Sequence, residues 1–426
     1  MRRAAWVPPS VRAWLACSAL VAWAGCDEAS TNARTAPEPA GGVESASPAS
    51  SATGAADSAP RSADSAHLSD AKRSEPTAGP APSSASTQGA NADPQAPGEP
   101  ADPPPPLPRG RIPSKLTREP PTPLDGAPPR GPIDVGLDGA WLRRMAGGAI
   151  TRVTENQGGS TVTIRLTFED GARAVLKADQ TRSATNYRSE IAAYHVDRLL
   201  GFGRTAPVVG RRFSRAAMRA HLVHAGARPE FLARFDQELR SPPEAPDEVK
   251  GAVIAWHSER LHSLEVPRRF GEWTAPGATV PAEIAPHLVP LSELTLFDFL
   301  IDNTDRYSGG NVLRLGPRGP IIFLDNGAGF ADWRAQREHA LTSDLTRICR
   351  YPAPLVRALE RVGPAAPASQ RLGERLRRSL RKDPLTPVLT PLHLEALDRR
   401  VAQILEHTTR CTQSTTTERD GGPHPN

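Results

Sequence analysis

The fold is decided by the stretch DNTDRYSGGN at residues 302–311 and by the tripeptide DNG at residues 325–327. The first stretch follows an apolar run, 291–301, that predicts a buried helix. Residues 311–315 and 321–324 are apolar segments separated by a Gly/Pro turn, so we expect them to form a hairpin. The carboxylates of Asp305 and Asp325 are thereby predicted to lie at neighbouring ends of that hairpin.

Two carboxylates placed in this way are typical of phosphoryl transfer sites. One orients the acceptor hydroxyl and takes its proton, and the other binds the divalent metal that bridges the donor phosphates. We therefore assign Asp305 as the catalytic carboxylate, Asp325 as a metal ligand and Asn311 as a second ligand. The structural alternative is that Asn, Asp and Gly occur here only because they favour turns, and we prefer that alternative for Asp302.

A lysine and a glutamate upstream fit the same chemistry. Residues 160–168 alternate apolar and polar side chains, Glu169-Asp170-Gly171 is a turn signal, and 172–177 is a second strand. A helix is predicted at 186–200. Lys177 ends the strand and Glu190 lies on the helix, the order in which a kinase lysine on the donor phosphates is held by a carboxylate. Alternatively, both side chains are merely solvated.

The remaining segments complete an α+β fold. The motif G-x-G-x-x-G is absent, and the candidate phosphate loop is Gly158-Gly159 within residues 155–160, for which a plain turn is the alternative. Residues 253–256 predict a short buried strand, and 344–407 are helical by their periodicity, with breaks at Pro352 and 384–387. A strand-rich half with one helix, followed by a helical half, predicts a two-lobed α+β domain.

These blocks in this order resemble the four-jointed family of Golgi kinases and, more distantly, the secretory-pathway casein-kinase family. The segments that carry the resemblance are 174–177, 190–202, 207–209, 250–256, 297–306, 322–330 and the region around Cys349. The resemblance implies an atypical protein-kinase-like fold, ATP with Mg or Mn, and transfer to a Ser/Thr or sugar hydroxyl in an exported compartment.

By matching positions, the resemblance assigns the ion pair to Lys177 and Glu190, catalysis to Asp305 and metal binding to Asp325. It also places Trp256 near the adenine-binding hinge. Asn311 departs from the pattern, because it lies one residue further from the catalytic Asp than in ordinary protein kinases. Cys349 and Cys411 either pair, as family members often do, or leave a loose thiol near the tail.

The N-terminal part of the chain reads as an export signal and a tether. Arg2, Arg3 and Arg12 precede a short apolar run, and Ala24-Gly25-Cys26 resembles a lipoprotein signal in which Cys26 is lipidated. Cleavage after Ala24 with simple secretion is the alternative. Residues 27–130 consist largely of Ala, Ser, Pro, Gly and Thr and hold almost no aliphatic or aromatic residue that could build a core. We therefore predict a signal peptide at 1–26, a disordered linker at 27–130, the kinase-like domain at 131–412 and a disordered tail at 413–426.

Charge excludes one class of partner. The net charge of +5 comes from 52 basic and 47 acidic residues that are scattered along the chain, so we expect no nucleic acid partner. The predicted protein is an exported kinase, either secreted or a cell-envelope lipoprotein held to the membrane through Cys26. Its acceptor is a protein or glycan outside the cytoplasm. The alternatives are a pseudokinase-type binding module at the envelope and a structural lipoprotein that binds no nucleotide.

Overall fold

The computed structural model describes residues 103–110, 120–124, 126, 129–157, 160–181, 186–267, 269–275, 277–307, 310–331 and 341–420, with side chains as far as Gln413. The predicted signal peptide with Cys26, most of the predicted linker, and Gly158 and Gly159 lie outside the described residues. Among the helices described, none has both the length and the apolar character that a membrane crossing requires.

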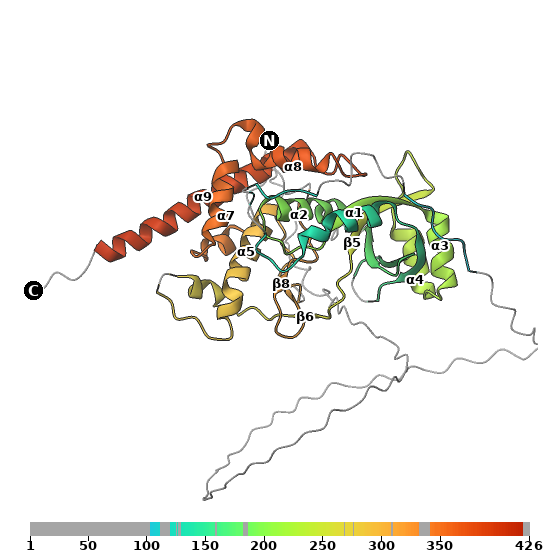
Figure 1. Ribbon diagram of the computed structural model, residues 1–426, viewed down its shortest axis with the longest axis horizontal. Helices are drawn as coiled ribbons and strands as arrows, with labels where there is room; N and C mark the ends of the chain where they lie inside the picture. Colours follow the sequence, from blue (N-terminus) through green and yellow to red (C-terminus); the bar gives the residue numbers. More distant parts are fainter. Residues whose placement is uncertain are drawn as a thin grey trace, which may run out of the picture. The chain divides into compact units, whose positions relative to one another are not determined.

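An antiparallel five-stranded sheet forms the first lobe, with strand order β1-β2-β3-β5-β4 (Figure 1). The predicted hairpin is present as β2 and β3, with Lys177 opposite Thr163. The strand predicted at 253–256 is the end of a longer β5 that lies beside β3. The strands are β1 (Ile150–Glu155), β2 (Thr163–Phe168), β3 (Arg173–Ala178), β4 (Val208–Ser214) and β5 (Glu248–Ala255).

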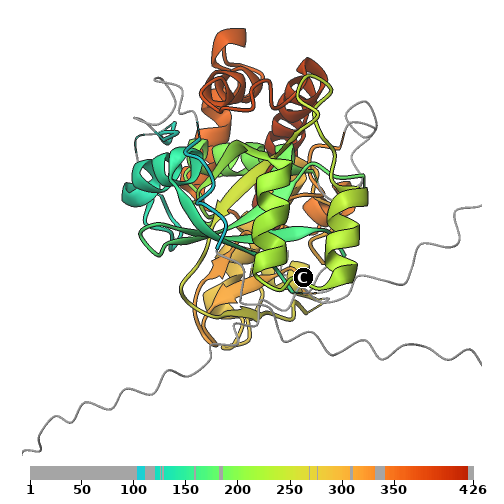
Figure 2. The same ribbon diagram turned by 90° about the vertical axis from the view of Figure 1, so that its right-hand side faces the viewer.

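Four α-helices pack around this sheet. The predicted helix is α2 (Tyr187–Leu199), which begins where the Asn186 side chain accepts a hydrogen bond from Arg188 N at 3.0 Å. The sequence did not resolve the other three, which are α1 (Asp138–Gly147), α3 (Arg215–His224) and α4 (Pro229–Glu238). Figure 2 shows α3 and α4 side by side in front of the sheet.

The second lobe is built on helix α5 (Ala285–Ile301), whose C-terminal half is buried throughout. The predicted second hairpin is present but short, and β6 (Leu261–Ser263) joins β7 (Leu313–Leu315) and β8 (Ile321–Ile322) in a three-stranded sheet. The predicted C-terminal helices follow and lie together in Figure 1: α6 (Thr342–Thr346), α7 (Ala353–Val362), α8 (Leu372–Leu380) and α9 (Pro391–Asp420). Short 3-10 turns are η1 (Val135–Leu137), η2 (Phe270–Thr274) and η4 (Ala368–Gln370).

The folded part extends beyond both predicted boundaries. Leu107 is 2% exposed and bridges to Ile150 of β1, and Arg211 donates a hydrogen bond to Pro108 O at 3.1 Å. Arg130 forms a 2.6 Å ion pair with Glu293 of α5. At the other end, α9 stays helical past residue 412. Residues outside 131–412 thus contact or continue the domain, because a Pro-rich segment still offers backbone carbonyls and an occasional apolar side chain to its neighbours.

Three aromatic rings join the lobes. Phe202, just after α2, packs against Phe297 of α5 with ring centroids 5.5 Å apart, and Phe297 packs against Phe323 at 5.0 Å. All three rings are fully buried. Since Phe323 shortly precedes Asp325, this cluster fixes the end of the hairpin relative to α2 and α5.

Candidate active site

Lys177 connects two carboxylates from different parts of the chain. Its Nζ lies 2.6 Å from Glu190 Oε1 on α2 and 2.7 Å from Asp325 Oδ1 after β8. Burial by itself lowers the pKa of Lys177, but attraction to Asp325 and Glu190 outweighs burial, and the pKa is raised. Lys177 in turn lowers the pKa of Asp325 despite burial of that carboxyl. Lys177 and Asp325 are therefore both held in their charged forms, and Glu190 is the second partner of the Lys177 ammonium.

Helix α2 is tied directly to the turn that carries Asp325. Ser189 Oγ donates a hydrogen bond to Asn326 O at 2.5 Å. Gly329 packs so closely that a Cβ there would lie 2.7 Å from Ser189 Oγ and 2.9 Å from Ile301 O. These contacts fix the distance between Glu190 and Asp325. Packing of α2 against residues 326–329 therefore positions the triad of Lys177, Glu190 and Asp325.

The backbone at Asp325 is in the left-handed region, with φ 58°. Its carbonyl accepts a 3.4 Å hydrogen bond from Asn303 Nδ2, and the next side chain, Asn326, accepts one from Arg306 Nη2 at 2.7 Å. Asp and Asn tolerate this conformation better than most residues. The turn composition of 325–327 therefore serves both backbone geometry and placement of the Asp325 carboxylate.

Arg306 is the buried centre of the loop formed by residues 302–307, which follows α5. Its guanidinium contacts both carboxylate oxygens of Asp298 on α5, at 2.9 and 3.2 Å, and also donates to Leu324 O. Burial raises the pKa of Asp298, although Arg306 opposes that effect. The preceding residue, Asp305, is half-buried, and its backbone N–H donates to Asn303 Oδ1 at 3.3 Å. Asp305 is thereby held between Asn303 and the rigid Arg306.

Asn311 lies beside the same loop in spite of its unusual spacing. Its Nδ2 donates to Asp305 O at 2.9 Å, while Arg306 Nη1 donates to Asn311 O at 3.3 Å. The amide nitrogen is thus used for positioning, and Oδ1 is the atom suited to a cation. Mg²⁺ is bound by oxygen ligands, so the side-chain oxygens of Asp325 and Asn311 are of the type that would hold such an ion.

Asp302 has the structural role that its turn composition predicts. It ends α5 in the left-handed conformation, with φ 59°, and forms a 3.5 Å ion pair with Arg400 of α9. Its side chain is only 2% exposed. Asp302 therefore links the 302–307 loop to helix α9.

Trp256 follows β5, and two arginines contact its ring. The Arg165 and Arg173 guanidiniums stand 4.8 and 5.5 Å from its ring centroid. The pairing of β3 with β5, which the sequence did not predict, places Val175 opposite Ile254. Val175 lies on the same face of β3 as Lys177. Because side chains alternate between the two faces of a strand, the spacing of two residues between Val175 and Lys177 could have placed both on one face.

A second buried charge network was also missed. Arg198 of α2 pairs with Asp138 of α1 at 2.6 Å, and Asp197 accepts backbone hydrogen bonds from residues 203–205. Arg204 then contacts Glu293 of α5 at 2.8 Å and donates to Ile321 O at 3.0 Å. This network fixes α2, and hence Glu190, against the second lobe. The adjacent Asp197 and Arg198 within an otherwise apolar helix stretch were its sequence signal.

Cys349 and Cys411 form a disulfide between the segment after α6 and helix α9. The sequence left this pairing open. The bond lies beside His407, whose Nε2 is 2.7 Å from Ile348 O. The covalent link therefore anchors residues 347–349 to α9.

Fold and site together define a protein-kinase-like domain: a strand lysine paired to a helix carboxylate, facing an aspartate at the end of a hairpin in the second lobe. Residues 137–222 and 278–420 match the family model described as Fam20C, Golgi casein kinase, C-terminal, and the chain belongs to this family. The expected resemblance to Golgi and four-jointed kinases is confirmed.

Several characterised proteins are similar to this chain. Human extracellular serine/threonine protein kinase FAM20C is 26% identical over 320 residues, covering 64% of this chain and 54% of the relative. The glycosaminoglycan xylosylkinase of Danio rerio is 24% identical, covering 67% and 79%. Human four-jointed box protein 1 is 24% identical, covering 64% and 65%. The chain spans about half the length of the first of these relatives and of the mouse and human pseudokinase FAM20A.

Solved structures confirm the fold. The Golgi casein kinase aligns with a TM-score of 0.55 at 20% identity, covering 66% of this chain and 77% of that one. The structure of hydra Fam20 with sugar aligns with a TM-score of 0.51 at 22% identity, covering 70% and 95%. The predicted two-lobed, atypical kinase-like α+β fold is therefore correct.

Proposed function

We propose that the chain is an ATP-dependent phosphotransferase that moves the γ-phosphate to a hydroxyl group. The observation that carries this proposal is the contact of Lys177 with both Glu190 and Asp325, at 2.6 and 2.7 Å. A protein that used this fold only as a scaffold would have no physical need for a buried cation poised between two carboxylates. The family relationship and the relatives named as kinases support the same conclusion.

Each residue has a distinct part in the reaction. Lys177 binds the donor phosphates while Glu190 keeps its ammonium in place. Asp325 and Asn311 hold Mg or Mn, which neutralises charge on the phosphates. Asp305 orients the acceptor hydroxyl and accepts its proton. The solved Golgi casein kinase with Mn and ADP bound supports this choice of cofactors.

The adenine is proposed to lie against Val175 and Ile254, with Trp256 at the outer edge. Val175 is fully buried and Ile254 is 5% exposed, so both are held by packing. The Gly158-Gly159 pair remains the proposed phosphate loop on the basis of its sequence alone. Thermal stabilisation by ATP with Mn in the wild type, weakened in Ile254→Glu, tests this placement.

A pseudokinase-type binding module is the second candidate. Mouse pseudokinase FAM20A is 27% identical over 267 residues, covering 54% of this chain and 47% of the relative. The Lys177–Asp325 contact also satisfies both charges in the absence of nucleotide. Nucleotide binding without transfer to any acceptor would favour this candidate. Retention of Asp305, Asn311 and the complete triad favours the enzyme.

The acceptor is proposed to be a protein or glycan outside the cytoplasm. Relatives named as extracellular kinases and the Cys349–Cys411 disulfide support an oxidising, exported compartment. We also propose a lipid on Cys26, from the residues around it alone. Membrane-fraction recovery that is lost in Cys26→Ser would support the lipid, whereas secretion of the wild type into the medium would exclude it.

A further inference from the structure

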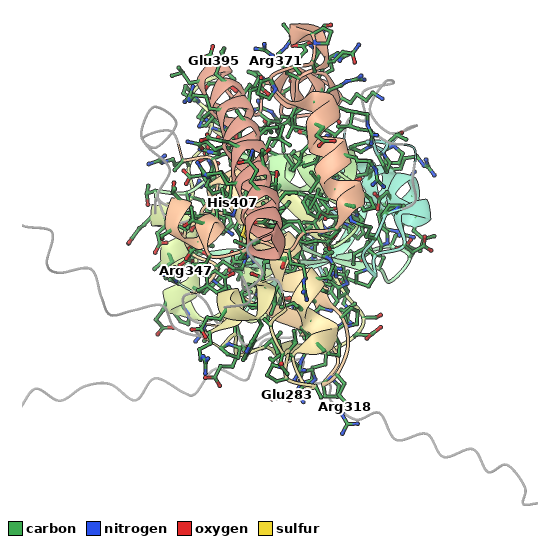
Figure 3. All side chains as sticks on the ribbon, turned by 90° about the vertical axis from the view of Figure 1, so that its left-hand side faces the viewer. Glu283, Arg318, Arg347, Arg371, Glu395 and His407 are labelled. Atoms are coloured by element: carbon green, nitrogen blue, oxygen red, sulfur yellow. A yellow bond between two sulfur atoms is a disulfide. The ribbon has the colours of Figure 1, made fainter. Side chains whose placement is uncertain are left out.

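A disulfide and a histidine come together where helix α9 meets the segment after α6. Cys411 and His407 lie four residues apart on α9 and so share one face of the helix, while Cys349 reaches them from the other segment. One ligand atom from each of the three side chains lies within 4.8 Å of the other two. Figure 3 labels His407 on α9 and Arg347 on the segment that leads to Cys349, on the face of the second lobe that carries this junction.

The imidazole of His407 faces the sulfur of Cys411. Its Nε2 stands 3.4 Å from Cys411 Sγ. In a tetrahedral zinc site, with Zn–S of about 2.3 Å and Zn–N of about 2.0 Å, a thiolate sulfur and an imidazole nitrogen are roughly 3.5 Å apart. These two atoms are therefore already at the separation that a shared zinc ion would impose.

Cys349 supplies the third ligand atom and the more open side of the cluster. His407 is 5% exposed and Cys411 is 8% exposed, whereas Cys349 is the most accessible of the three. Two thiolates on one tetrahedral zinc ion are about 3.8 Å apart. After reduction, a small movement of the Cys349 sulfur away from Cys411 would therefore make room for the ion, and the ion can enter from that side.

The carbonyl beside the cluster does not depend on His407 alone. Ile348 O accepts a 2.7 Å hydrogen bond from His407 Nε2 and a second hydrogen bond from the Tyr351 hydroxyl. The Tyr351 ring also stands edge-on to the imidazole, with ring centroids 6.3 Å apart. When Nε2 binds a metal instead, Ile348 O keeps the hydroxyl as a donor, so no buried carbonyl is left unsatisfied.

The ligand types select the metal. Two thiolates and one imidazole suit Zn²⁺, whereas Mg²⁺ and Mn²⁺ prefer oxygen ligands. This site is therefore chemically distinct from the one proposed at Asp325 and Asn311. Within the part of the chain that the structure describes, no fourth His, Cys, Asp or Glu joins the cluster. Water would fill the fourth position of a tetrahedral ion.

We propose that the reduced chain binds Zn²⁺ through Cys349, His407 and Cys411. The ion then joins the same two segments that the disulfide joins in the oxidised chain. A disulfide forms from two thiols, so every chain passes through the reduced state before the bond is made. In that state, zinc holds the two cysteines together and keeps them from other partners. The inference does not rest on the proposed kinase function.

The exchange between the two states balances. A dithiol reductant transfers two electrons and two protons to the Cys349–Cys411 bond, which gives two thiols and leaves the reductant as a disulfide. Zn²⁺ displaces both thiol protons, because the thiolate is the form that binds metal. The proton on His407 Nε2 passes through solvent to Nδ1, so the neutral ring binds through Nε2. Oxidation of the two thiolates by another disulfide restores the bond and releases the ion.

The link at Cys349 also supports the segment before α5. Thr274 Oγ1 accepts a 3.2 Å hydrogen bond from Cys349 N and donates to Gly271 O at 2.7 Å. A Cβ at Gly271 would lie 2.9 Å from Arg347 Cβ, so the two segments pack closely. Whichever bond holds residue 349 on α9 therefore also holds the 3-10 turn η2 in place. Zinc preserves this packing while the disulfide is open.

Zinc retention by the full chain tests the proposal directly. The protein would be reduced with a phosphine, which does not compete for zinc as dithiols do, and bound zinc would be measured by mass spectrometry after removal of free metal. His407→Gln removes the imidazole but keeps a donor for Ile348 O, and His224→Gln on α3 is the exposed control. We expect one zinc ion per chain in the reduced wild type and control, and none in the oxidised wild type. The affinity of His407→Gln should be lower by about 100-fold or more.

Two further readouts separate a zinc site from a general effect on folding. Co²⁺ bound to the reduced wild type should show thiolate-to-metal charge transfer, which is absent in Cys349→Ser/Cys411→Ser. Zinc should also raise the urea midpoint of the reduced wild type and leave that of reduced His407→Gln unchanged, because an ion that binds only the folded chain stabilises it. Oxidised His407→Gln should still unfold cooperatively, which shows that the variant folds.

Four results would overturn the zinc site. They are no zinc on the reduced wild type, equal zinc affinity in His407→Gln, equal zinc on the oxidised and reduced wild type, and zinc binding that is lost in Cys17→Ser/Cys26→Ser. The last result would place the ion on the N-terminal cysteines. Stabilisation by ATP with Mn should be the same in the wild type and His407→Gln when both are oxidised.

Discussion

Lys177 Nζ stands 2.7 Å from Asp325 Oδ1, which places the strand lysine of one lobe in direct contact with the proposed metal ligand of the other. The same ammonium also contacts Glu190 at 2.6 Å. Without nucleotide, the single Lys177 ammonium is therefore shared between two carboxyl groups. Bound nucleotide can replace this contact, because its phosphates can pair with Lys177 and its metal can pair with Asp325.

Replacing either Lys177 or Glu190 should disable phosphate transfer, because each change removes the same ion pair. We expect Lys177→Met and Glu190→Gln each to lower kcat/KM by about 100-fold or more, a loss of about 3 kcal/mol of transition-state stabilisation. The double variant should be little worse than Lys177→Met, because Glu190 acts by holding Lys177. Lys250→Met on β5 is the matched control. Fully additive losses would show that the two residues act independently.

Asn311 offers a test of its ligand role despite its shifted spacing. Asn311→Ala removes both the oxygen donor and the hydrogen bond to Asp305 O, whereas Asn311→Asp keeps an oxygen. We expect the Ala variant to need roughly tenfold more Mn for half-maximal rate, and the Asp variant to stay near the wild-type value. Equal Mn dependence in all three proteins would remove Asn311 from the metal site.

The buried ion pair of Arg306 with Asp298 should contribute strongly to the unfolding free energy through the 302–307 loop. Both side chains are at most 3% exposed, so Arg306→Leu leaves an unpaired buried carboxyl. We expect urea denaturation to show a loss of about 3–5 kcal/mol, partly recovered in Arg306→Leu/Asp298→Leu. The exposed pair of Arg377 with Glu374 provides the comparison, and Arg377→Ala should cost less than about 1 kcal/mol. Similar losses for both arginines would refute the assignment.

The disulfide should contribute strongly to stability. It closes a loop with a sequence separation of 62 residues, for which chain entropy gives about 4 kcal/mol. We expect Cys349→Ser/Cys411→Ser, or the wild type in reductant, to unfold at clearly lower urea concentration. Reductant should then have no further effect on the double variant. An unchanged midpoint on reduction would mean that packing alone holds residues 347–349 on α9.

Acid should destabilise the protein through His195. Burial, and then the charges of Arg198 and Lys382, lower the pKa of this imidazole to about 3. The unfolded chain binds a proton at the ordinary pKa near 6.5, so stability is lost as pH falls from there toward 3. We expect a slope of about 1.4 kcal/mol per pH unit from this group.

The variant His195→Gln isolates that slope, because Gln keeps a partner for Ser379 Oγ. Asp383, whose pKa burial raises to about 6, acts in the opposite sense and is present in both proteins. The wild type loses stability through His195 as the pH falls and His195→Gln does not. The difference in unfolding free energy between the two proteins should therefore narrow or reverse below pH 6. A constant difference from pH 7 to pH 4 would show that His195 is not buried in the neutral form.

The order of Lys177, Glu190, Asp305 and Asp325 was readable from the sequence because each lies at the end of a strongly patterned strand or helix. The distances between these four residues could not be predicted from the sequence. They depend on contacts between the lobes, such as the one between Ser189 and Asn326. The charged network of Asp138 and Arg198 was missed because its members lie far apart in sequence and resemble surface residues until α1 covers them.

The position of the segment before α5 was unpredictable for a related reason. Residues 269–274 have no periodicity, and their position depends on the Thr274 hydroxyl and on the segment that the Cys349–Cys411 disulfide holds, a pairing that the sequence left open. Tertiary contacts, which periodicity does not encode, therefore decide where this segment lies.

Transfer of phosphate from γ-labelled ATP in the presence of Mn tests the central claim most directly. The full-length chain would be compared with Asp325→Ala and Asp305→Asn, with autophosphorylation, an acidic protein and p-nitrophenyl glycosides as acceptors. We predict that the wild type incorporates label and that both variants lose it, although Asp305→Asn is still stabilised by ATP with Mn. Equal incorporation by all three proteins, or no incorporation by a wild type that ATP with Mn fails to stabilise, would contradict the account.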